Sequence, residues 1–242
     1  MRVLSLPEPT SATPARTAPR VSSPPPEEPR PAPVTLAGLV RHLAILPLPA
    51  RTLTLVTANV DGLPPLEATV VRWAAARARA LVAKLGSRER FVVSYRREVL
   101  GLTGIGIGTV LAGDGLLVGL AAIARRLSAS GLVEARAGAA FAASLSGIAA
   151  PETTPVARDL LEEAARGRFP PPLASLVDSF GDPDAEEGAL KERAARLASA
   201  SSAGPDSLAG VVLLARSLLD GDDLAALADA TRARAGGTTA RG

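Results

Sequence analysis

The stretch from residue 99 to residue 124 limits what this chain can fold into more than any other segment. It is apolar and rich in glycine, and it carries a single charge, Asp114. As one helix it would be long enough to span the hydrocarbon core of a bilayer, which is roughly 30 Å thick. An aspartate near the centre of such a helix costs about 2.5 to 3.5 kcal/mol, and glycines contribute little apolar area. The stretch therefore favours a buried core in a water-soluble protein, with membrane insertion as the alternative.

Asp114 divides this stretch into two elements. Its carboxylate can cap a helix by accepting a hydrogen bond from a free amide of the first turn. Apolar residues follow it at helical spacing, at Leu116, Leu120, Ile123 and Leu127. The residues before it, 104–111, alternate with a period of two, which predicts a strand.

Two further strands are predicted upstream, over residues 52–60 and 91–96, with a helix between them from about residue 65 to residue 85. Strand, helix and strand at this spacing form a βαβ unit. The sequence therefore predicts an α-dominated α/β fold, with a small sheet of about three strands followed by a helical C-terminal half. The helix after residue 65 is predicted to bury one stripe of side chains, with Trp73 at the edge of that stripe. The stripe consists of Leu66, Val70, Ala74, Ala78, Leu81 and Leu85.

Changes in composition divide the chain into three parts. Residues 1–33 are rich in proline, serine, threonine and arginine, and we expect a disordered arm that serves as a tether. A proline-rich ligand and an organellar transit peptide are alternatives for this arm. Residues 34–150 are predicted to form a small α/β domain, and residues 151–242 a helical region whose last helices have narrow apolar faces. Prolines and glycines separate the helices expected after residue 132, which cover 133–148, 156–166, 173–180, 185–201, 208–219 and 223–235.

Composition excludes several classes of site. The chain has no cysteine, so disulfides, thiolate metal sites and thiol nucleophiles are excluded. His42 is the single histidine, and we expect it to be a partly exposed structural residue. We therefore predict no catalytic residue, no metal site and no cofactor. The net charge of +3 and the 2% of aromatic residues also make nucleic acid an unlikely partner.

Gly104, Gly106 and Gly108 form the best candidate for a cofactor site, because glycines near a helix start can bring backbone amides to a phosphate. The segment from residue 102 to residue 111 resembles the glycine signature of GNAT-type acyltransferases, in which an Arg/Gln-x-x-Gly-x-Gly/Ala loop binds the pyrophosphate of acetyl-CoA. It departs from that signature at Thr103, which stands where the family has Arg or Gln. The favoured alternative is that these glycines allow close packing against a neighbouring element.

A second candidate is the basic group Arg88, Arg90, Arg96 and Arg97, which could contact phosphates or anionic lipid. A solvated strand edge, kept from aggregating by its charges, is the favoured alternative.

These observations favour a non-enzymatic structural, adaptor or assembly protein of the cytoplasm. It would act on one or more protein partners through the arm and a helical docking surface, with self-association as a further option. One rival is a CoA- or nucleotide-dependent transferase that uses residues 101–115. The other is a membrane-peripheral protein that inserts residues 99–124.

Overall fold

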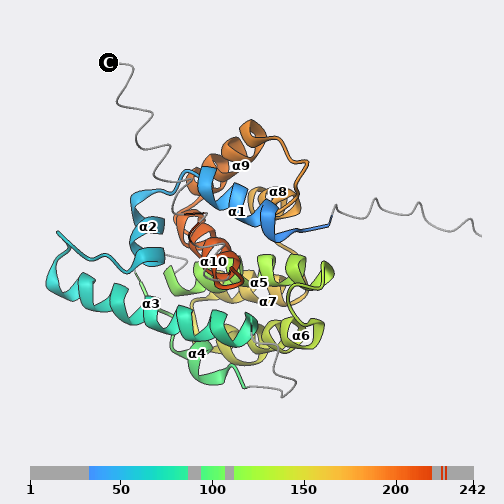
Figure 1. Cartoon of the computed structure of the whole chain (residues 1–242). Helices are drawn as coiled ribbons and strands as arrows, with labels where there is room; N and C mark the ends of the chain where they lie inside the picture. The colour runs from blue at the N-terminus through green and yellow to red at the C-terminus, as the bar shows by residue number, and fades with distance from the viewer. Residues whose placement is uncertain (1–32, 87–93, 107–111, 220–224, 226, 228–242) are drawn as a thin grey trace, which may run out of the picture. The chain divides into compact units, whose positions relative to one another are not determined.

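The computed structural model describes residues 33–86, 94–106, 112–219, 225 and 227 (Figure 1). Helices, turns and loops make up these residues, and no strand occurs among them. The predicted α/β fold with a three-stranded sheet is therefore wrong, and the protein is helical. The α-helices are α1 Leu36–Ile45, α2 Ala50–Thr57, α3 Pro65–Gly86, α4 Arg96–Leu100, α5 Ala112–Ala129, α6 Ala135–Ser144, α7 Pro155–Ala165, α8 Pro171–Ser179, α9 Glu187–Ala200 and α10 Gly204–Ser217. A short π-helix, Leu145–Ala149, and a 3₁₀ helix, Ala150–Glu152, follow α6.

The first predicted strand, residues 52–60, falls largely on α2. This helix buries Thr52, Leu55 and Val56, which lie on one face at helical spacing. The alternation of apolar and polar residues is thus equally compatible with a short amphipathic helix. The hydroxyl of Thr54 donates to the carbonyl of Ala50, four residues earlier, which satisfies this polar side chain within the helix.

The other two strand predictions also fail where the structure describes them. Residues 91–93 lie outside the described residues, and Arg96 begins the short helix α4. Gly104 and Gly106 have φ angles of +74° and +122°, which place them in turns that a strand cannot contain. Residues 107–111 lie outside the described residues.

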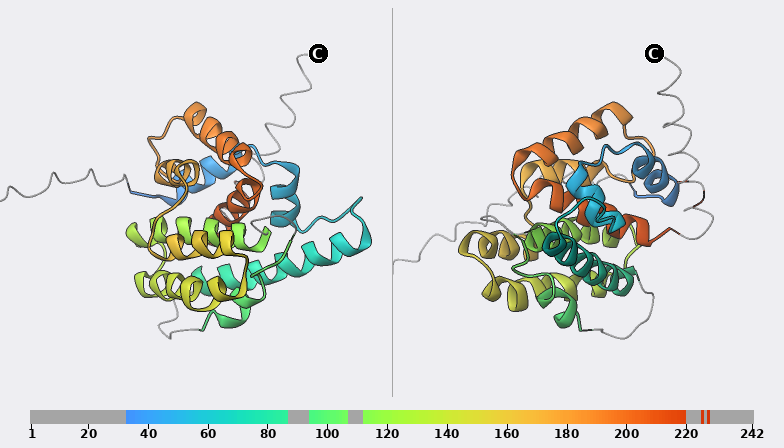
Figure 2. Two further views of the ribbon diagram at one scale, coloured as in Figure 1. Left: turned by 180° about the vertical axis from the view of Figure 1, so that it is seen from behind. Right: turned by 90° about the vertical axis from the view of Figure 1, so that its left-hand side faces the viewer.

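Two buried helices, α5 and α10, cross at the centre of the core (Figures 1 and 2). Every residue from 113 to 124 is buried, so this part of the apolar stretch lies in the core, as predicted. In α10, residues 206–215 are also buried, so the expectation of a narrow apolar face is wrong for this helix. The helices α2, α3 and α9 pack around α10, which explains why it is apolar on all sides.

Glycines allow these two helices to approach closely. A Cβ atom at Gly119 would lie 1.9 Å from the carbonyl oxygen of Ser207, and one at Gly210 would lie 2.4 Å from that of Leu116. The Ser207 hydroxyl donates to the carbonyl oxygen of Gly115 at 2.9 Å, which adds a buried polar contact at the crossing. Among the helices that the structure describes, none is both long and apolar enough to cross a membrane.

The buried face of α3 differs from the predicted stripe in its N-terminal half. Leu66 and Val70 are 79% and 37% exposed, although the pattern places them in the core. The buried residues of this helix are Ala68, Ala74, Ala75, Ala78, Leu81, Val82 and Leu85. The C-terminal half of α3 therefore packs as predicted, whereas large apolar side chains of its N-terminal half remain uncovered.

His42 in α1 is fully buried, so the expectation of a partly exposed histidine is wrong. Its Nδ1 accepts a hydrogen bond from the backbone N–H of Gly181 at 2.8 Å, and its ring packs against Phe180. Burial lowers the pKa of His42, because desolvation disfavours the charged imidazolium. His42 thus fastens α1 to the turn that follows α8.

Candidate functional site

Asp114 lies in the first turn of α5 rather than at its N-cap, and it binds the preceding loop. One carboxylate oxygen accepts from the N–H of Gly104 at 3.1 Å, and the other accepts from the hydroxyl of Thr153 at 2.6 Å. The side chain is fully buried. Burial raises the pKa of Asp114, whereas the bonds from Thr153 and Gly104 lower it. This carboxylate therefore ties three separate segments together.

One glycine of the site predicted from the sequence, Gly104, contacts this carboxylate. Gly104 and Gly106 lie beside the start of α5, and a Cβ atom at Gly106 would be 2.6 Å from the amide nitrogen of Ala112. Gly108 lies outside the described residues. The amide of Gly104 already donates to Asp114, so a phosphate would have to displace the chain's own carboxylate. Cofactor binding at these glycines stays a prediction.

A second buried carboxylate, Asp206 in α10, lies next to the same turn of α5. Arg51 in α2 donates to both of its oxygens, at 2.8 and 2.7 Å. Burial raises the pKa of Asp206 to about 6, against the charge and hydrogen bonds of Arg51, which lower it. The Thr52 hydroxyl donates to the carbonyl of Pro205, so the pair joins α2 to α10. In the described part of the chain, no three His, Asp or Glu side chains gather in a way that could hold a metal ion.

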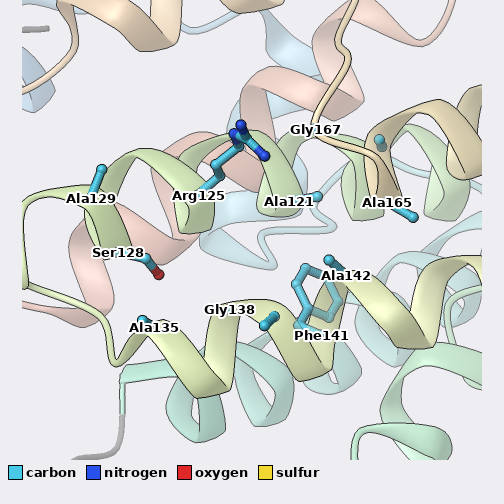
Figure 3. Close-up of a pocket in the computed structure, with 12 residues that line it drawn as sticks. Ala121, Arg125, Ser128, Ala129, Ala135, Gly138, Phe141, Ala142, Ala165 and Gly167 are labelled. Carbon is cyan, nitrogen blue, oxygen red and sulfur yellow. The ribbon is translucent and has the colours of Figure 1, made fainter. Parts of the chain in front are cut away.

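A cavity of about 320 Å³ lies between α5, α6 and the end of α7 (Figure 3). Its walls are mostly alanine methyl groups, with the ring of Phe141 among them. Two polar side chains, Arg125 and Ser128, line the cavity from α5. They are three residues apart, so they share one face of that helix. This is a concave apolar space with a small number of polar groups, as ligand sites usually are.

Each of these two polar groups lies against a glycine from another element. The Ser128 hydroxyl points toward Gly138 of α6, where a Cβ atom would lie only 2.6 Å from its oxygen (Figure 3). The Arg125 guanidinium packs on Gly167, whose φ of +77° marks the turn after α7. A Cβ atom at Gly167 would lie 2.0 Å from the nearest guanidinium nitrogen. Side chains at either glycine would therefore displace the polar groups from the cavity.

Neither polar group has a hydrogen bond or ion pair to another described residue. The Ser128 oxygen is buried and has no hydrogen-bond partner among the residues described. Arg125 is exposed, and no carboxylate within the described ranges pairs with it. Sequence reasoning missed this cavity because its two glycines belong to other elements, Gly138 to α6 and Gly167 to the turn after α7, and no periodic pattern links them to α5. The available signal was an arginine and a serine three residues apart at the end of an apolar helix.

A third feature is an exposed apolar face on α3, formed by Leu66, Val70 and Trp73 and called the α3 face below. The three side chains follow at intervals of four and three residues, and Trp73 is 44% exposed. The guanidinium of Arg77 lies 5.6 Å from the centre of the Trp73 ring, one helical turn on, in a cation–π contact. The α3 face thus combines large apolar side chains with a cation.

The basic group predicted from the sequence is described in part. Arg96 and Arg97 are exposed at the start of α4, whereas Arg88 and Arg90 lie outside the described residues. The structure therefore brings together two of the four predicted arginines, and their role in anion contact stays a prediction.

Comparison with known proteins relates part of the chain to a family. The family model of the oxamate carbamoyltransferase subunit AllH matches residues 102–215. This is just under half of the chain, and it runs from the loop before α5 through most of α10. It includes Asp114, the cavity and the α5–α10 crossing, but not the α3 face. No curated protein and no solved structure matches the chain.

Proposed function

We propose that this chain is a subunit of a carbamoyltransferase assembly and that it acts by binding another subunit through the α3 face. The observation that carries the proposal is the match of residues 102–215 to a family described as an oxamate carbamoyltransferase subunit. The matched residues contain the packed centre of the fold, so the similarity concerns the core that supports the molecule. An accessory role also agrees with the absence of cysteine and the single histidine in this sequence.

The α3 face supplies a surface for a partner. Leu66 and Trp73 are 79% and 44% exposed, and Leu53 in the neighbouring helix α2 is 47% exposed. Large apolar side chains grouped on a surface are typical of protein–protein interfaces, and tryptophan is among the residues that contribute most binding energy. The face lies outside the matched residues, so it would provide a contact particular to this chain.

Charge indicates the kind of partner. Along α3, Arg72, Arg77 and Arg79 accompany one acid, Glu67, and no carboxylate in the described part of the chain pairs with Arg77. We expect the partner subunit to present an amphipathic helix with a hydrophobic stripe and a flanking acid. Its stripe would cover the α3 face, and its acid would pair with Arg77.

The test is purification of the tagged full chain from its own cells, followed by native mass measurement and subunit identification. We expect a complex of fixed stoichiometry that transfers a carbamoyl group between carbamoyl phosphate and oxamate, and no such transfer by the isolated chain. A chain that catalyses the transfer alone, or one that purifies without another subunit, would refute the proposed role.

Substitutions then test the surface separately. Trp73→Ala should weaken binding of the purified partner subunit by roughly 30-fold, because an interface tryptophan contributes about 2 kcal/mol or more. Leu66→Ser should also weaken it, whereas Val156→Ser should not, since Val156 is a comparably exposed apolar residue on α7. If the complex forms but all three variants bind alike, the partner uses another surface and the α3 face is excluded.

A further inference from the structure

The turn between α8 and α9 is held by α1 through contacts that meet at Gly181. The backbone N–H of Thr35 donates to the carbonyl of Gly181 at 3.1 Å, and the N–H of Gly181 donates to Nδ1 of His42 at 2.8 Å. The approach is close, because a Cβ atom at Gly38 would lie 2.1 Å from the carbonyl oxygen of Gly181. One side of α1, with His42 at its centre, therefore depends on this turn.

The imidazole of His42 fits this place only in its neutral form. Because Nδ1 accepts the hydrogen bond from Gly181, the neutral ring carries its hydrogen on Nε2. Nε2 is buried and has no hydrogen-bond partner within the described part of the chain. A second proton would sit on Nδ1 and meet the N–H of Gly181, donor against donor. Protonation thus breaks the bond to Gly181 and leaves a cation in a fully buried site.

The charges around His42 do not offset this cost. Arg41, next to it on α1, lowers the pKa of His42, as burial does, whereas Asp182 and Glu187 raise it. Burial is the largest influence, and Glu187 is already engaged with Arg41 at 3.4 Å. Asp182 also acts on the buried Arg126 of α5, together with Asp178 of α8. The charged residues of α10, which also packs on α1, lie near its two ends, at Asp206 and Arg216.

α1 covers apolar surface on α9 and α10 (Figures 1 and 2). It contributes Leu39 and Ile45 to the core. The helix has ten residues, and an isolated helix of this length is unstable in water, so its place depends on the contacts that its buried side makes. A loss of the bond between His42 and Gly181 therefore acts on an element with little stability of its own.

We propose that protonation of His42 releases α1 from the turn between α8 and α9 and exposes the apolar residues beneath it, while the other helices stay folded. The release is a pH-dependent local opening. It is independent of the α3 face, because its residues belong to α1 and to the turn at Gly181.

Hydrogen–deuterium exchange of the full chain at pH 7.5 and pH 5.5, read by mass spectrometry, tests the release. Each rate is divided by the intrinsic rate at the same pH, which gives a protection factor. Release takes up one proton, so below pH 6.5 the open population should rise by up to about tenfold for each pH unit, until the folded-state pKa is reached. Peptides from residues 35–46 should lose protection about threefold to tenfold and should exchange faster than α10 at both pH values. A change below about twofold, or exchange of α1 at the rate of α10, would overturn the proposal.

Variants assign the effect to His42, which is the single histidine of the chain. His42→Asn places an acceptor near the position of Nδ1, and His42→Gln keeps a longer side chain. Neither can be protonated, so both should lose the pH-dependent fall in protection. Asp206→Asn is the matched control, because burial raises the pKa of Asp206 to about 6, in the same pH range, and this variant should keep the fall. Circular dichroism melts show which variants are folded, and one folded His42 variant is sufficient. A fall that persists in it, or that disappears in Asp206→Asn, would refute the role of His42.

Discussion

The crossing of α5 and α10 at Gly119 gives the sharpest prediction for stability. In Gly119→Ala the new methyl group would lie 1.9 Å from the carbonyl oxygen of Ser207, and 2.7 and 2.8 Å from that residue's carbonyl carbon and Cα. All three atoms belong to the backbone of a buried helix, so no side-chain rotation can relieve the overlap. The two helices must separate by about 1 Å or more, since nonbonded carbon and oxygen atoms lie more than about 3 Å apart.

The cost follows from this geometry. Overpacking a core usually costs about 1 to 3 kcal/mol, and a rigid backbone neighbour places Gly119→Ala at the upper end, at about 3 kcal/mol. For a chain of this size the melting temperature should fall by roughly 6 to 12 °C. Gly115→Ala should cost less, because its nearest neighbours lie at 3.1 to 3.3 Å.

The measurement is urea denaturation followed by circular dichroism, with Gly147→Ala as the matched control. A methyl group at Gly147 would have no neighbouring atom within 4 Å, and this residue lies at the surface. Its replacement should be neutral or stabilise by up to about 1 kcal/mol. The expected order of stability is Gly147→Ala, then Gly115→Ala, then Gly119→Ala. If Gly119→Ala and Gly147→Ala differ by less than about 0.5 kcal/mol, the close crossing is incorrect.

Three further predictions concern buried polar groups. Arg51→Met should destabilise the chain by about 2 to 3 kcal/mol at pH 7.5, less than for a fully buried pair because the Arg51 side chain is 46% exposed. In urea titrations this loss should shrink below pH 6, where Asp206 takes up a proton, and a loss independent of pH would contradict the ion pair. Folding lowers the pKa of His42 below 6.5, because burial disfavours the charged imidazolium. The neutral imidazole therefore contributes its full stabilisation above pH 6.5, and this stabilisation is lost as the pH falls through the pKa of His42 in the folded protein. The stability of the wild type relative to His42→Gln, which keeps an acceptor but cannot be protonated, should therefore decline from pH 7.5 to pH 5, and a constant difference would be inconsistent with this. Asp114→Ala should cost about 1 to 3 kcal/mol in the same assay because it leaves two donors unpaired, whereas Asp114→Asn should cost less, and equal costs would count against the hydrogen bonds.

Much of the helical part of the fold could be predicted from the sequence. Prolines and caps mark the helix boundaries, so α7, predicted over 156–166, is observed at Pro155–Ala165, and α8, predicted over 173–180, at Pro171–Ser179. These signals are local, because proline fixes its own φ and removes a backbone donor wherever it occurs. The first predicted strand failed for a related reason. In a segment as short as α2, a period of two and a period of 3.6 select overlapping sets of residues.

The functional features were less accessible, because they depend on contacts between distant segments. The periodic pattern of α3 predicts that Leu66 is buried in the core, but this side chain is largely exposed. The cavity needs Gly138 and Gly167 opposite Arg125 and Ser128, and no local pattern connects these positions. Asp114 was correctly singled out as the unusual charge. Its partners, Gly104 and Thr153, emerge only from the tertiary structure.

The order of the helices along the chain has a consequence for biosynthesis. α5 leaves the ribosome well before α10, the helix that covers it, since about 90 residues separate their ends. At ordinary translation rates this interval lasts on the order of ten seconds. The helices α6, α7 and α8, which also contact α5, are made during this interval, but the side of α5 that packs on α10 stays uncovered until α10 appears. That exposed, glycine-rich apolar side makes the nascent polypeptide a natural client for chaperones that bind at the ribosomal exit.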